Sequence, residues 1–89
     1  MRTIRRCIES GAFQVAHHFV ERMDQRGLFW PDVLAVVDDP VDVRDGGPET
    51  WGRPKWIVAG HSATHDDIEV VCVVDRDELG ELTVFITLY

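Results

Sequence analysis

The sequence predicts an α+β domain in which two N-terminal helices pack on one face of a roughly four-stranded antiparallel sheet. Apolar residues recur at helical spacings of three and four before residue 40 and alternate or run continuously after it. Helices followed by strands, rather than alternating with them, are typical of this class. A chain of 89 residues has room for one modest core, so we expect a single domain over residues 1–89.

The first helix is predicted from about residue 12 to residue 26. Ser10 stands where a residue could cap its start, and Gly27 supplies the left-handed position that commonly ends a helix. Residues 2–8 alternate only weakly, and they are read either as a short strand or as the lead-in to this helix. One apolar stripe marks the helix face that should be buried: Val15, Ala16, Phe19, Val20 and Met23.

The second helix is predicted to begin at Pro31 and to stop at the sequence Asp38-Asp39-Pro40. Proline is tolerated in the first helical turn, where its missing N–H has no partner to lose. Asp32 in that turn suits the positive end of the helix dipole.

Strands are predicted over residues 41–45, 55–59, 68–74 and 82–89. Residues 68–74 are almost continuously apolar, so we expect them to form the central strand. In the last strand, Leu82, Val84, Ile86 and Leu88 should face the helices. The other face should be open and carry hydroxyls and aromatic rings, from Thr83, Phe85, Thr87 and Tyr89.

The charge of the chain is unevenly spread. The net charge is −7, yet residues 1–30 carry five arginines against three acidic residues. Proteins that bind nucleic acid usually present a basic patch, so the sequence allows only a local one, and we expect no DNA binding by this chain alone. No apolar run approaches the roughly 20 residues that span a bilayer, and no signal-peptide core follows residue 6. We therefore expect a cytoplasmic protein without membrane contact.

Three basic side chains are predicted to form a ridge on the first helix. His18, Arg22 and Arg26 are each four residues apart, and this spacing makes them neighbours on a helix surface. Guanidinium groups bind phosphate, and an imidazole can transfer a proton near neutral pH. The alternative is structural, in which the arginines bond a helix end or pair with acidic loops.

The stretch HHFVERMDQRGL resembles the His-Ala-x-x-Arg-Met-x-x-Arg-Gly-Ile signature of a small family of domains of unknown function. That family is grouped with RelE-like and BrnT-like toxins, which are ribonucleases. Phe19 departs from the alanine of the signature, and the resemblance continues through PDVLAVVDDP, WIVAG and FITLY. The signature residues present here are His18, Arg22, Met23, Arg26 and Gly27.

The resemblance implies a RelE/barnase-like fold and a metal-independent endoribonuclease toxin of a toxin–antitoxin system, or an inactive relative. It points to His18, Arg22 and Thr87 as catalytic residues. Its implied partners are RNA and either an antitoxin protein or a second copy of the chain, with no cofactor. RNA cleavage of this kind needs a base, an acid and cations that stabilise the charged phosphorane.

Further residues are candidates for binding the substrate. Arg26 could clamp a phosphate and Tyr89 could position it. Trp51, Arg53 and Lys55 interleave aromatic and basic groups, as single-strand RNA binders do.

Two pairs of residues could bind a metal or form a disulfide, but the sequence favours neither. His61 and His65 lack a helix to align them, so a solvated turn is favoured over a metal site. Cys7 and Cys72 are too few for a disulfide framework and are expected to be buried thiols.

A different class of function is open as well. The acidic balance, and the lack of a lysine cluster, favour a non-enzymatic protein-binding module that uses the His18, Arg22 and Arg26 helix face. One geometric question bears on both hypotheses: if the hydroxyl face of the last strand points away from the helices, His18 can reach it only around a sheet edge.

Overall fold

The computed structural model describes residues 2–48, 52–62, 66–78 and 80–89. In these residues, three helices pack on a five-stranded mixed sheet that is mostly antiparallel. None of the described helices is long and apolar enough to cross a membrane. The elements are α1 (Arg2–Ser10), β1 (Phe13–Val15), α2 (His17–Gln25), α3 (Trp30–Asp38), β2 (Asp42–Pro48), β3 (Pro54–His61), β4 (Asp67–Asp77) and β5 (Gly80–Leu88).

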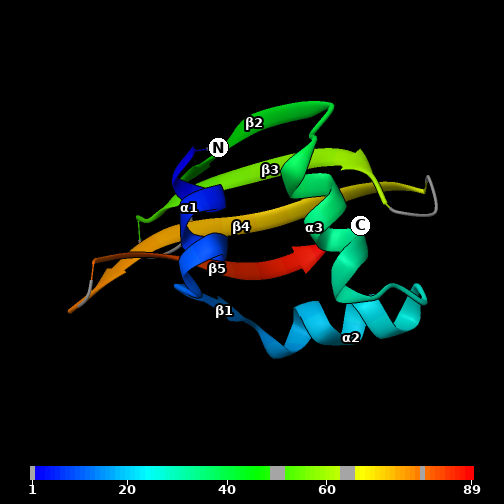
Figure 1. The fold of residues 1–89 in the computed structure, drawn as a ribbon, viewed down its shortest axis with the longest axis horizontal. Coiled ribbons are helices and arrows are strands. Elements are labelled where there is room, and N and C mark those ends of the chain that lie inside the picture. Colours follow the sequence, from blue (N-terminus) through cyan, green and yellow to red (C-terminus); the bar gives the residue numbers. More distant parts are fainter. Residues whose placement is uncertain (1, 49–51, 63–65, 79) are drawn as a thin grey trace.

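The strands lie in the order β1-β5-β4-β3-β2 (Figure 1). Strand β1 pairs with β5 in parallel, and the other neighbours are antiparallel. Strand β4 is central, which confirms the prediction made for residues 68–74. Strands β3 and β5 pair with its two edges, so its backbone groups are hydrogen-bonded on both sides.

The N-terminal region differs from the prediction. Residues 2–10 form helix α1, which had been read as a short strand or a lead-in, and Gly11, with φ of 79°, ends it. The helix expected from residue 12 begins only at His17, because residues 13–15 pair with β5 instead. Ser10 does not cap α2: its hydroxyl donates to the Cys7 carbonyl. The predicted two helices and four strands are therefore three helices and five strands in the described chain.

Helix α3 follows the prediction closely. Pro31 lies in its first turn, and the buried Asp32 carboxylate accepts a hydrogen bond of 2.8 Å from the Phe29 N–H. That bond satisfies one of the donors that a helix start leaves unpaired. Helix α2 also ends where expected, with Gly27 at φ of 65°.

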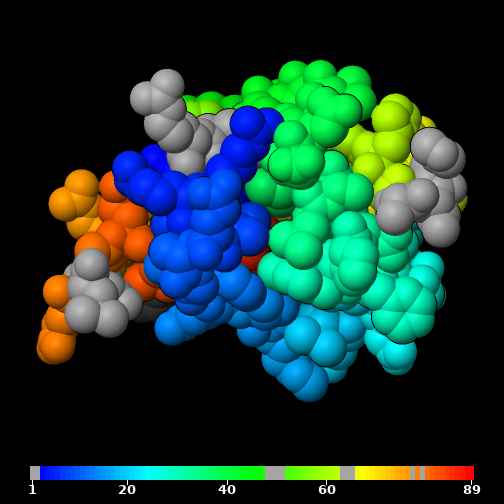
Figure 2. Space-filling view, viewed as in Figure 1, coloured from blue at the N-terminus to red at the C-terminus, as the bar shows by residue number. Residues whose placement is uncertain are grey.

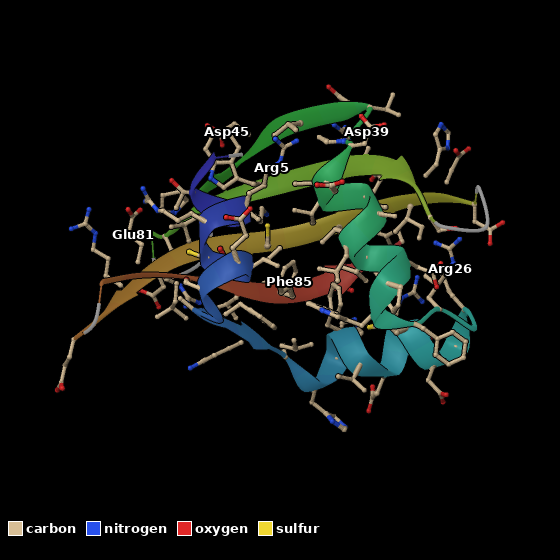
Figure 3. The ribbon with its side chains drawn as sticks, in the orientation of Figure 1. Arg5, Arg26, Asp39, Asp45, Glu81 and Phe85 are labelled. Atoms are coloured by element: carbon tan, nitrogen blue, oxygen red, sulfur yellow. The ribbon has the colours of Figure 1, made fainter. Side chains whose placement is uncertain are left out.

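The core lies between the sheet and the helices. Figure 2 shows the helix side of the molecule, where the atoms of α1 and α3 hide most of the sheet. Phe85 stands in this layer (Figure 3) and is fully buried. Its ring centre lies 5.4 Å from that of Phe19, 5.3 Å from that of Trp30 and 6.1 Å from that of Phe13. These four rings join β5 to β1, α2 and α3, and aromatic groups dominate core energetics when packed so closely.

A bulge in β5 overturns the predicted division of its faces. Val71 pairs with Thr87, but the next residue, Cys72, pairs with Phe85, so β5 has one extra residue, Ile86, at this point. Phe85 and Leu88 both belong to the buried core on the helix side. The prediction had placed Phe85 on the open face. A bulge shifts the alternation by one residue, which sequence periodicity does not reveal.

Candidate functional site

The end of helix α2 and the residues that close β5 meet at Arg22. Its Nε donates to the Leu88 carbonyl at 3.1 Å, and its Nη1 donates to the Gln25 side-chain oxygen at 3.3 Å. The guanidinium carbon lies 5.5 Å from the centre of the Tyr89 ring, within cation–π range. Helix α2 presents Arg22 here because Phe19, one turn earlier, is fully buried against the core. The structure therefore brings together Arg22, a predicted catalytic residue, and Tyr89, a predicted substrate-binding residue.

Arg26 lies just beyond α2, at the end of the molecule opposite to Glu81 (Figure 3). Its Nη2 donates to the Asp67 carbonyl at 3.4 Å. Arg22 therefore connects helix α2 to the end of β5, and Arg26 connects the residue after this helix to the start of β4. Part of the structural alternative is realised, although the acceptors are main-chain carbonyls rather than acidic side chains.

His18 is exposed and lies one turn before Arg22. Within the described residues its imidazole has no hydrogen bond or ion pair. The neighbouring His17 does have one, with Nε2 at 2.9 Å from Glu21 Oε1. His18 is therefore an accessible imidazole on the same helix ridge as Arg22, and no contact holds it against β5.

Thr87 is less accessible than the sequence suggested. It lies on the sheet face away from the helices, but only 8% of it is exposed, and its hydroxyl oxygen is buried without a partner among the described residues. Tyr89 is 58% exposed, and its main chain pairs with Glu69. The Tyr89 ring can therefore meet a ligand, whereas the Thr87 hydroxyl lies beneath the surface. Arg22 contacts the ring of Tyr89, the residue that follows β5, whereas no described contact joins His18 to this strand.

Two other predicted substrate-binding residues, Arg53 and Lys55, lie at the other end of the sheet. Arg53 Nη1 is 2.9 Å from Asp75 Oδ2, and Lys55 pairs with Val73. Tyr89 pairs with Glu69, six residues from Asp75 along β4, which is about 20 Å in a strand. Arg53 and Lys55 are thus not part of the Arg22 site. Trp51 and His65 lie outside the described residues.

The pKa of Asp75 is below its ordinary value of 3.8. The main cause is a hydrogen bond from the Arg76 backbone N–H, followed by one from the Arg53 side chain. Both stabilise the ionised carboxylate. The Arg53–Asp75 ion pair is partly exposed.

A hollow that the sequence analysis missed lies beside Tyr89. It has a volume of about 450 Å³, and its lining includes Val41, Ala59, His61, Asp67, Glu69 and Tyr89. His61 had been read as part of a solvated turn. The register His61↔Asp67 places the two residues opposite each other across β3 and β4, a juxtaposition that spacing in the sequence does not show. The signal that could have found it is the strand alternation that puts Ala59 and His61 on one face.

Polar groups around this hollow are paired. His61 Nδ1 lies 2.9 Å from Asp67 Oδ1, and Arg44 Nη2 lies 2.8 Å from Glu69 Oε1. In the described part of the chain no three His, Cys, Asp or Glu side chains are grouped to hold a metal ion. We call the region formed by Arg22, Arg26, Tyr89 and the hollow the Arg22 corner. It contains guanidinium groups, an aromatic ring, carboxylates and an imidazole. These groups can bind a phosphate and a planar polar ring.

Comparison with known proteins gives a family but no activity. Residues 15–89 match the family described as Domain of unknown function (DUF4258), so the match begins within β1 and includes every residue of the Arg22 corner. No curated protein and no solved structure is similar enough to count as a match. The match shows no link to RelE-like or BrnT-like toxins.

Proposed function

The chain belongs to the DUF4258 family of domains of unknown function. We propose that it is a metal-independent endoribonuclease; the proposed relation to the RelE-like and BrnT-like toxins rests on the sequence resemblance described above and not on the family match. The observation that carries the proposal is the position of Arg22. Its guanidinium lies over the exposed ring of Tyr89 and one helical turn from the exposed His18. Neither of its two side-chain hydrogen bonds uses Nη2, which can therefore donate to a phosphate oxygen.

The proposed reaction is attack of a ribose 2′-hydroxyl on the adjacent phosphorus. A base removes the hydroxyl proton, the bond between phosphorus and the 5′-oxygen breaks, and an acid protonates that oxygen. His18 takes the role of proton-transfer group and Arg22 stabilises the charged phosphorane. Tyr89 positions the substrate by stacking, and Arg26 binds a neighbouring phosphate. Thr87 has no part in this scheme because its hydroxyl oxygen is buried.

The second candidate is a protein-binding module that uses the surface of α2. Two observations favour it. Val20 is an apolar side chain that is 50% exposed on this helix. Arg22 and Arg26 already donate hydrogen bonds to main-chain carbonyls of the chain itself, which is a structural use of both side chains. An antitoxin protein or a second copy of the chain would be the partner. This candidate predicts that the protein does not cleave RNA. It also predicts that Val20→Asp weakens association with the partner.

The test is cleavage of total RNA by the purified protein, with and without EDTA. We expect cleavage in both conditions, and loss of roughly 100-fold or more in rate for His18→Ala, the usual contribution of a general acid or base. His17→Ala is the matched control, because His17 is the adjacent exposed imidazole and lies off the Arg22 ridge.

Rates are compared per folded molecule, with thermal unfolding of each variant as the measure of folding. Equal rates for His18→Ala and the wild type would remove His18 from the mechanism. Absence of cleavage by the wild type would contradict the enzyme and leave the binding module.

A further inference from the structure

The hollow beside Tyr89 lies where β3 ends and β4 begins. Figure 1 shows these two strand ends at the right of the ribbon. Two of the large hydrophobic side chains that the described surface exposes border it: Val41 is 69% exposed and Tyr89 is 58% exposed. Exposed apolar side chains at the rim of a concavity are typical of a ligand site. Ala59 and Ile68 add apolar wall beneath them. The hollow therefore offers a flat ligand an aromatic ring on one side and aliphatic groups on the other.

Carboxylates and an imidazole supply the polar part of this wall. Glu69 meets Arg44 through Oε1, so its Oε2 remains as an acceptor. His61 directs Nδ1 to Asp67, which leaves Nε2 as the nitrogen that can meet a ligand. The lining thus contains more acceptors than donors. It suits a ligand that donates hydrogen bonds from the edge of a ring.

Tyr89 connects the hollow to the proposed phosphate site. The residue lines the hollow, and its ring also lies beneath the Arg22 guanidinium. A phosphate on Arg22 and a ring in the hollow would therefore be adjacent parts of one ligand. A nucleotide has this combination of an anionic group and a planar polar ring.

We infer that the hollow is a nucleobase subsite, selective for a base with an exocyclic amino group, next to the phosphate held by Arg22. The base stacks on Tyr89, and its amino group donates to the carboxylate of Glu69. Cytosine presents such a donor, and carboxylate side chains accept from it, whereas uracil presents a carbonyl oxygen at the same position. This inference rests on the proposed function for the placement of the phosphate. It adds the substrate preference of the site.

The experiment is titration of the purified protein with cytidine 5′-monophosphate and, separately, with uridine 5′-monophosphate, followed by NMR. These nucleotides cannot be cleaved between residues, so binding is measured apart from catalysis. We expect the His61 and Tyr89 signals to shift, and the cytidine nucleotide to bind about tenfold more tightly. Equal affinity for the two nucleotides, or shifts confined to residues outside the hollow, would overturn the inference.

Two substitutions test the subsite, and a third serves as a control. Ala59→Leu should fill the hollow and weaken binding of the cytidine nucleotide at least tenfold. Ala35→Leu is the matched control, since Ala35 lines a different hollow between α1 and α3 and should leave the affinity unchanged. Glu69→Gln gives a readout that does not depend on filling space. A glutamine amide can donate to the uracil carbonyl, so the preference for cytidine over uridine should fall or reverse.

Failure of this inference differs from failure of the ribonuclease proposal. Cleavage of RNA that is unaffected by Ala59→Leu, at cytidine and uridine sites alike, would overturn the subsite and leave the ribonuclease. Selective binding of the cytidine nucleotide in the hollow, without RNA cleavage by the wild type, would support the subsite and contradict the ribonuclease.

Discussion

The guanidinium of Arg22 lies over the Tyr89 ring at 5.5 Å while its Nε donates to the Leu88 carbonyl. One side chain of α2 thus contacts both the main chain and an aromatic side chain at the end of β5. This contact connects the basic ridge of the helix to the end of β5. Its strength can be measured without knowing the ligand.

Arg22→Ala should lower the free energy of unfolding by about 1–2 kcal/mol, because it removes a charged hydrogen bond and a cation–π contact. Urea denaturation measures this loss. Arg76→Ala is the control, since Arg76 is exposed and its substitution should change stability by less than about 0.5 kcal/mol. A double-mutant cycle with Tyr89→Leu should give a coupling of about 0.5–1 kcal/mol. Additive effects would show that the ring and the guanidinium do not interact.

Phe85→Ala should destabilise the protein by about 3–5 kcal/mol, the usual cost of emptying a buried aromatic site. The ring is fully buried among those of Phe13, Phe19 and Trp30. Val84→Ala, at the half-buried residue beside it, should cost about 1 kcal/mol. Equilibrium denaturation compares the two variants. A larger loss for Val84→Ala would mean that β5 has the opposite face toward the helices.

Cys72 should resist thiol reagents in the folded protein. Its side chain is fully buried, and burial raises the pKa of this thiol to about 12, so almost no thiolate forms near neutral pH. In the Cys7→Ser variant, an aromatic disulfide reagent should modify Cys72 only at the rate of unfolding, and fully in urea. Rapid modification of the folded variant would contradict the buried position in β4.

Asp75→Asn should flatten the acid side of the stability curve. The pKa of Asp75 is lowered in the folded state, chiefly by the Arg76 backbone N–H and then by Arg53. A lowered pKa means that the carboxylate stabilises the fold above its unfolded pKa, and that this stability is lost as the pH falls through the folded pKa. Thermal unfolding between about pH 2 and pH 6 should show the wild type above the variant at the upper end, with the two converging at the lower end. A constant difference across this range would exclude titration of Asp75 as the cause.

The sequence by itself determined the elements whose signals are local. Pro31 and Asp32 set the start of α3, and Gly27 set the end of α2, through backbone geometry and capping that neighbouring residues decide. Residues 68–74 are almost continuously apolar and leave no polar face for water, and this pattern predicted the central position of β4. The spacing of Arg22 and Arg26 likewise placed both side chains at one end of a helix.

Only the tertiary structure decided the features that depend on pairing between distant residues. Residues 13–15 share an apolar pattern with the helix that follows, and their parallel pairing with β5 makes them a strand. The bulge at Ile86 moved Phe85 to the core, because a single extra residue reverses every side chain beyond it. The hollow exists because the β3–β4 register sets His61 opposite Asp67 and the main chain of Tyr89 pairs with Glu69. Such contacts are set by the hydrogen-bond register of the whole sheet, which no local stretch of residues encodes.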